Sequence, residues 1–215
     1  MRTEEEQAEI IREWWEKHGF TTILAIVAAI ALILGWRQWQ AQQEATSAEA
    51  SALYQNMISA AQVLDQGAAG AAPEQVQGPA EQLLEDFPRS AYADYASLML
   101  ARLAVEDGEL EQAAEHLQRV ADSPASENLE YTARMRLARL YLEMDQTERT
   151  LEQLAGGFSP AWEGQAREVR GDALRRQGDL EGARQAYESA LDILEGSPRE
   201  RDRVRMKLDD LKSAS

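Results

Sequence analysis

Cysteine is absent from the 215 residues, and histidine occurs only as His18 and His116. The chain therefore has no cysteine nucleophile and no cysteine that could carry a lipid. The absence of cysteine is compatible with an oxidising compartment. His116 should lie half-exposed on an amphipathic helix, with only the adjacent Glu115 as an acidic neighbour on its face. We expect no metal site there.

Signals for β-strands are also missing, because no run of alternating β-branched residues follows residue 40. Without strands, no Gly-rich loop stands in the strand–loop–helix context that cradles phosphates. The acidic pairs Glu106/Asp107 and Asp209/Asp210 fall where turns or helix caps are expected, and there carboxylates usually serve solubility. We therefore predict no catalytic residues, no cofactor and no enzymatic activity.

Basic residues are scarce: 22 Lys and Arg stand against 38 Asp and Glu, a net charge of −16. Such a chain would be repelled by nucleic-acid phosphates, so a nucleic-acid partner is disfavoured. Residues 38–133 contain only three basic side chains and 16 acidic ones. We expect this half to stand off from anionic lipid headgroups.

One long apolar run stands out, from Phe20 to Trp36, and contains no charged residue. Its length as a helix is about 25 Å, slightly short of a bilayer core of roughly 30 Å. Tryptophans flank it on both sides, and such rings favour the headgroup interfaces. We predict a transmembrane helix at 19–39 with these interface anchors: Trp14, Trp15, Phe20, Trp36, Arg37 and Trp39.

A cleaved signal peptide or a buried helix of a soluble core are the alternatives. The polar segment 1–18 with its six Glu residues, and Arg37 directly behind the apolar run, argue against cleavage. Three basic residues precede the span, whereas Arg37 is the only one after it until Arg89. The positive-inside bias then makes 1–18 a cytoplasmic tail, either an amphipathic helix or disordered, and places 40–215 outside the cytoplasm.

The region after the span is expected to be helical throughout. Residues Gln38–Leu64 are rich in good helix formers and lack Gly and Pro, and the small, uncharged segment 66–73 is typical of a loop. Further on, Pro88, Pro124, Pro160 and Pro198 are spaced by 36, 36 and 38 residues. A period in the mid-thirties with an internal turn indicates a helix-turn-helix solenoid.

The internal turns align when Gly108, Asp145 and Gly178 are taken as equivalent. Relative to them, small residues recur at two places and a large residue at a third: Ala101, Ala138 and Gly171; Ala113, Thr150 and Ala183; Leu117, Leu154 and Tyr187. This pattern resembles the tetratricopeptide repeat, although Arg167 and Leu174 stand where that repeat has Trp and Tyr, and Thr150 is polar where Ala is usual. We expect repeats at about 45–87, 94–124, 131–160 and 164–197 and a polar capping helix at 199–211, with apolar Val204, Met206, Leu208 and Leu211.

In tetratricopeptide proteins the first helices of successive repeats line a concave groove that binds peptides. The resemblance therefore implies groove residues in this chain: Tyr95, Leu98, Arg102, Val105, Thr132, Met135, Arg139, Leu142, Gln165, Glu168, Asp172 and Arg175. Apolar residues at the start and mixed charges later favour an apolar polypeptide as the occupant. Alternatively, several of these side chains pack against neighbouring helices or point into water.

The order of features along the whole chain is more specific than the repeats. A short tail ends in Trp14-Trp15-Glu-Lys-His-Gly, the span ends in Gly35-Trp36-Arg37-x-Trp39, and Phe87-Pro-x-Ser-x-Tyr92 follows within the repeats. This combination resembles the YfgM family of bacterial inner-membrane proteins. The resemblance implies an ancillary subunit of the SecYEG translocon that associates with the membrane-anchored periplasmic chaperone PpiD and assists exported chains.

Two other functions stay open from the sequence. One is a repeat scaffold for envelope protein assembly, although outer-membrane scaffolds of that kind need a lipidated Cys. The other is a membrane-anchored signalling adaptor that acts through residues 1–18. The sequence also leaves open whether the groove holds client chains, the chaperone or another copy of the chain, and whether 38–64 packs on the solenoid.

Overall fold

The computed structural model describes residues 15, 29, 32–34, 36–38, 46–194 and 196–213. The chain forms two units, Met1–Glu49 and Ala50–Ser215. The predicted tail 1–18 and span 19–39 lie almost entirely outside the described residues. No helix within the described part of the chain is both long and apolar enough to cross a membrane.

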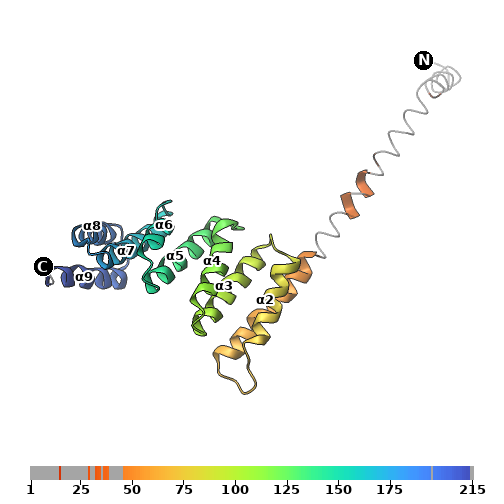
Figure 1. The fold of residues 1–215 in the computed structure, drawn as a ribbon. Coiled ribbons are helices and arrows are strands. Elements are labelled where there is room, and N and C mark those ends of the chain that lie inside the picture. Colours follow the sequence, from red (N-terminus) through yellow and green to blue (C-terminus); the bar gives the residue numbers. More distant parts are fainter. Residues whose placement is uncertain are drawn as a thin grey trace, which may run out of the picture. The chain divides into compact units, whose positions relative to one another are not determined.

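The second unit is built from helices, and no strand occurs among its described residues. It begins with helical residues 50–65, called here the leading helix, followed by a loop at 66–73. Each later helix packs against its neighbours in sequence (Figure 1). These helices are α2 (Glu74–Asp86), α3 (Ala91–Glu106), α4 (Leu110–Asp122), α5 (Glu127–Glu143), α6 (Thr147–Gln153), α7 (Pro160–Arg176), α8 (Leu180–Ile193) and α9 (Pro198–Ser213).

The three internal turns of the repeats share one backbone conformation. Gly108, Asp145 and Gly178 have φ values of 81°, 59° and 83°. After each of them, the next N–H reaches back five residues to a carbonyl, which closes the helix end in the manner of a Schellman motif. These bonds are Glu109 N to Ala104 O at 2.8 Å, Gln146 N to Tyr141 O at 2.8 Å and Asp179 N to Leu174 O at 3.0 Å.

Serine and proline set where the first helices of the repeats begin. Ser90 and Ser126 each accept a bond from a backbone N–H in the first turn of α3 and α5. Pro160 and Pro198 are the first residues of α7 and α9, where their missing N–H removes no helical bond. For this reason α3, α5 and α7 begin about a turn before the repeat starts expected from the sequence.

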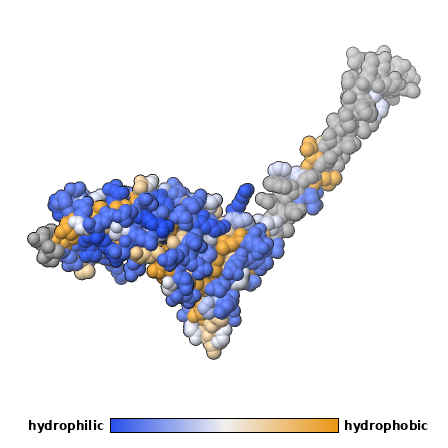
Figure 2. All heavy atoms as spheres, in the orientation of Figure 1, coloured by the Kyte–Doolittle hydropathy of each residue, from blue (hydrophilic) through white to orange (hydrophobic). Residues whose placement is uncertain are grey.

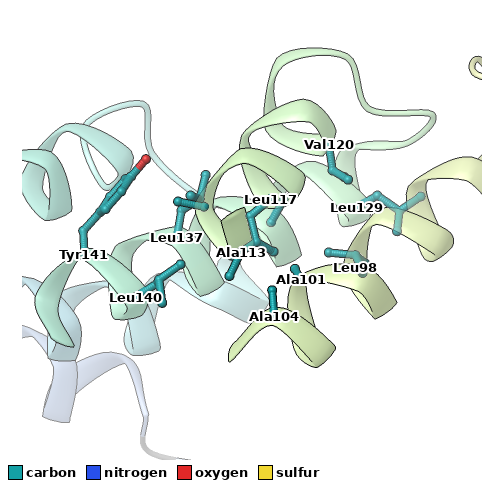
Figure 3. Close-up of a cluster of buried hydrophobic side chains, with 12 residues drawn as sticks. Leu98, Ala101, Ala104, Ala113, Leu117, Val120, Leu129, Leu137, Leu140 and Tyr141 are labelled. Atoms are coloured by element: carbon teal, nitrogen blue, oxygen red, sulfur yellow. The ribbon is translucent and has the colours of Figure 1, made fainter. Parts of the chain in front are cut away.

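Small and large side chains alternate between the stacked helices. Figure 3 shows Ala101 and Ala104 of α3 facing Ala113 and Leu117 of α4, while Leu137 lies on α5. The same arrangement recurs in the last repeat, where a Cβ at Gly171 would lie 2.6 Å from Cδ1 of Tyr187 and nearer still to its Cε1. The large ring therefore fills the space that a side chain at 171 would need, as expected from the sequence pattern.

A buried polar cluster fastens the loops around α3 and α4. Asp94 is 2% exposed; its Oδ2 accepts from Ala125 N at 2.7 Å and its Oδ1 from Arg119 Nη1 at 3.4 Å. Arg119 also donates to Ser97 Oγ at 3.0 Å and to Pro88 O at 2.6 Å. One arginine thus joins the segment before α3 to α4, and Asp94 holds the loop that leads into α5.

The last helix continues the repeat series as a further first helix. Three side-chain pairs join α7 to α9, and each spans 35 residues: Gln165 with Glu200, Glu168 with Arg203, and Asp172 with Lys207. Of the four apolar residues named for this helix, Val204, Leu208 and Leu211 are buried and Met206 is 67% exposed. Met206 points away because it lies two residues from both buried positions 204 and 208 on the helix.

Candidate protein-binding groove

Two adjoining hollows lie along the first helices of the repeats. The first, of about 530 Å³, lies between the leading helix, α3 and α5 and includes Tyr54, Tyr95 and Leu98 in its lining. The second, of about 420 Å³, lies between α3 and α5 over the side chains of Leu110 and Leu117 from α4. Arg102 and Arg136 line both hollows, so we treat them as one feature, the α3–α5 groove.

Tyrosines form one end of the α3–α5 groove. The rings of Tyr54 and Tyr92 have centroids 5.1 Å apart, and those of Tyr54 and Tyr95 are 5.7 Å apart. Tilted ring pairs at such distances are favourable contacts. Tyr95 remains 43% exposed and lines the groove, so it presents an apolar ring with a polar tip to an occupant.

The walls of the groove carry three arginines in different states. Arg102 is held by Asp65 of the leading helix and by Glu106 at 2.8 Å, and these bonds raise its pKa. Arg136 and Arg139 have no carboxylate partner within the described residues; Arg139 donates to the amide oxygen of Gln165 at 3.1 Å. Arg136 is exposed, but partial desolvation by the groove walls and repulsion by Arg139 lower its pKa.

Helix α9 occupies the positions beyond the groove. Glu168 is 3% exposed and accepts from Arg203 Nε at 2.7 Å, while Lys207 Nζ lies 2.8 Å from its Oε1. Burial alone would raise the pKa of Glu168, but the bonds from Arg203 and Lys207 outweigh it and lower that pKa. Lys207 also bonds Asp172 at 2.6 Å, so both carboxylates hold α9.

The predicted groove residues therefore divide into four sets. Tyr95, Leu98, Arg102 and Arg139 line the α3–α5 groove, whereas Glu168 and Asp172 pair with α9. Met135 is 1% exposed and packs with the buried residues Ala138, Leu154, Ala166 and Val169. Its side chain points into the core because that side of α5 faces α6 and α7. Arg175 is exposed near the end of α7 and lines neither hollow.

Several groove residues were not predicted, above all Arg136 and Tyr54. On α5 the predicted residues Thr132 and Arg139 line the groove, but the residue between them that does so is Arg136 and not the buried Met135. The sequence offered two signals for this assignment. Thr132 and Arg136 are four residues apart and so share one face of the helix, and of the neighbours Met135 and Arg136 the apolar Met is the one expected in the core. Tyr54 was missed because only its neighbours in space, Tyr92 and Tyr95, reveal its position.

The described residues include no group of three or more His, Cys, Asp or Glu that could hold a metal ion. His116 is partly buried on α4, and this burial lowers its pKa. The apolar floor, the tyrosine rings and the arginines of the groove supply apolar contacts, aromatic surface and guanidinium hydrogen bonds, which are the means of binding a polypeptide.

Comparison with known proteins agrees with this geometry. Residues 12–213 match a family model described as a tetratricopeptide repeat-like domain. The chain belongs to this family. The match extends over the described helices and accounts for the solenoid of paired helices seen in the structure.

Curated relatives align along nearly the whole chain. A protein of Escherichia coli (strain K12) named "Ancillary SecYEG translocon subunit" is 28% identical over 208 residues, 97% of this chain and 96% of the relative. A protein of the same name in Haemophilus influenzae is 26% identical over 97% of both chains. A third, from Neisseria gonorrhoeae, is 24% identical over 97% of this chain and 98% of the relative. The resemblance to the YfgM family inferred from the sequence is confirmed.

Proposed function

We propose that the chain is a non-enzymatic accessory subunit of the Sec translocon. The observation that carries this proposal is the near full-length similarity to proteins named ancillary SecYEG translocon subunit. A repeat domain with a groove suited to polypeptides supports it. In this role the α3–α5 groove binds a partner, either a chaperone of the PpiD type or an exported chain.

The proposed location is the bacterial inner membrane, with a single helix at 19–39, residues 1–18 in the cytoplasm and 40–215 in the periplasm. The exposed apolar side chains of Leu32, Ile33 and Leu34 support an anchor there, because they are 75%, 58% and 59% exposed. Consecutive apolar side chains that are exposed to this extent favour a lipid environment. Trp36, 63% exposed, is suited to the interface at the end of the span.

Crosslinking in intact membranes tests the association. A photoreactive amino acid replaces Trp36 in one variant and Leu180 in another; Leu180 is 40% exposed at the start of α8, so it is accessible but distant in sequence from the proposed anchor. We expect channel subunits in the products from position 36 and not in those from position 180. Absence of every SecYEG subunit from the position 36 products would refute the association.

Single-cysteine labelling tests the topology and benefits from the absence of cysteine. Ala69→Cys lies in the exposed loop at 66–73, and Thr3→Cys lies in the proposed tail. An impermeant maleimide should label Ala69→Cys in cells whose outer membrane has been permeabilised. Thr3→Cys should react only after the inner membrane is disrupted, and the reverse pattern would invert the proposed orientation.

A further inference from the structure

The α3–α5 groove combines an apolar floor with cations that lack carboxylate partners. Its floor includes Leu110 and Leu117, and Val105 at its edge is 47% exposed. Above this floor stand Arg136 and Arg139, which form no ion pair with any described residue. The chain has 38 acidic and only 22 basic side chains, so acidic partners for its arginines are plentiful. Two arginines that lack such partners beside an apolar hollow therefore distinguish this part of the surface.

The third arginine of the groove has a different role. Arg102 is paired with Asp65 and Glu106, so its charge is compensated and it has little capacity left for a ligand. Glu106 also lines the groove, but its charge is compensated by Arg102, and Glu143 is the second acidic residue of the lining. Arg136 and Arg139 therefore supply the free positive charge on the α5 side.

We propose that the α3–α5 groove selects a segment of a partner protein that carries a large apolar side chain with carboxylates beside it. The apolar side chain enters the hollow over Leu110 and Leu117, and the carboxylates accept hydrogen bonds from Arg136 and Arg139. Guanidinium groups bind carboxylates through paired N–H donors, which adds geometric selectivity to the charge attraction. This inference rests on the proposed role of the groove in binding polypeptides and specifies the chemistry of the segment.

Fluorescence anisotropy with three labelled peptides tests the selectivity, using the full chain in a mild detergent. The first peptide is helical and has Leu at the i and i+4 positions with Glu beside them; the second has Gln and the third Lys in place of every Glu. We expect the Glu peptide to bind about tenfold tighter than the Gln peptide, since each charge-assisted bond contributes modestly. The Lys peptide should bind most weakly because Arg136 and Arg139 repel it.

Two sets of variants assign the binding to the groove. Arg136→Gln with Arg139→Gln should weaken binding of the Glu peptide about tenfold and remove the difference between the Glu and Gln peptides. Arg199→Gln with Arg205→Gln makes the same charge change at exposed positions on α9 and should leave the difference intact. Val105→Ser should weaken binding of both peptides to a similar extent, because it removes apolar contact only.

Equal affinity of the intact chain for the Glu and Gln peptides would overturn the inference. So would unchanged discrimination in the Arg136→Gln, Arg139→Gln variant. If instead the groove holds a second copy of this chain, sedimentation will show a dimer that the Arg136→Gln, Arg139→Gln variant abolishes and that the peptides do not displace. That result also overturns the inference. A failure of SecYEG crosslinking at position 36 would refute the translocon role alone, because peptide selectivity is measured on the purified chain.

Discussion

The contact between Gly171 and Tyr187 allows a quantitative test of how the repeats pack. A Cβ at 171 would lie 2.6 Å from Cδ1 of the Tyr187 ring, about 1 Å closer than carbon atoms pack. The ring is buried and bonds Asp172 through its hydroxyl at 2.8 Å, so it cannot easily move aside. Overpacking of this kind costs about 1–3 kcal/mol.

Gly171→Ala also removes a helix-breaking residue, which returns about 1 kcal/mol of helix propensity. We therefore expect a net loss of about 0–2 kcal/mol in the free energy of unfolding, taking the two effects as opposed. Urea unfolding of the full chain in mild detergent, followed by circular dichroism, measures this change. The sign of one variant is not decisive, because the two effects are of similar size.

A double-mutant cycle removes that ambiguity. Tyr187→Leu combined with Gly171→Ala produces the pairing that already exists in the other repeats, Ala101 with Leu117 and Ala138 with Leu154. In the Tyr187→Leu background, Gly171→Ala should be neutral or stabilising by up to about 1 kcal/mol, since the clash is gone. Equal effects of Gly171→Ala in both backgrounds would refute the packing argument.

Three further predictions concern stability. Asp145→Gly should raise the free energy of unfolding by about 0.5–1 kcal/mol, measured in the same urea assay, because φ at Asp145 is 59° and favours glycine. Asp94→Ala should lower it by about 1–3 kcal/mol, since Ala125 N–H and Arg119 lose their buried acceptor; a loss no larger than that of an exposed acid would contradict this. The pKa of Glu168 is lower in the folded than in the unfolded chain, so its stabilisation is present above the unfolded pKa and is lost as the pH falls through the folded pKa. Unfolding titrations should therefore show a smaller loss of stability in acid for Glu168→Gln than for the wild type, and parallel losses would exclude the role of Glu168.

Features of the fold that depend on neighbouring residues could be predicted from the sequence. The turns at Gly108, Asp145 and Gly178 follow from spacing alone, because each internal turn repeats one local geometry. The small residues between the paired helices could also be predicted, because they recur at fixed distances from the turns. Thr150 is polar where the repeat usually has Ala, and the structure explains why it is tolerated: it is fully buried, and its hydroxyl donates to Gln146 O at 3.2 Å.

Features that join residues distant in sequence could not be predicted. The short helix α6 ends at Gln153, where Arg134 of α5 donates to Gln153 O at 2.9 Å and to Gly157 O at 3.3 Å. The guanidinium of Arg134 also lies over the Phe158 ring at 4.5 Å. No local pattern assigns an arginine on one helix to the carbonyls of the next loop, so the length of α6 depends on tertiary contacts.

The role of α9 decides how much of the predicted groove remains available. Its three 35-residue pairs place it where the first helix of another repeat would lie, and Glu168 and Asp172 are used to hold it. The apolar side of α9 is buried through Val204, Leu208 and Leu211. Glu168 and Asp172 of α7 still line a hollow of about 370 Å³, but both carboxylates already pair with side chains of α9. We therefore expect recognition to depend chiefly on the leading helix, α3 and α5. The unpaired arginines Arg136 and Arg139 lie on the last of these, which is where a charged ligand can still find a partner. On the face drawn in Figure 2, the surface of the repeat unit is largely hydrophilic with smaller apolar areas, so an occupant finds little apolar surface on which to bind.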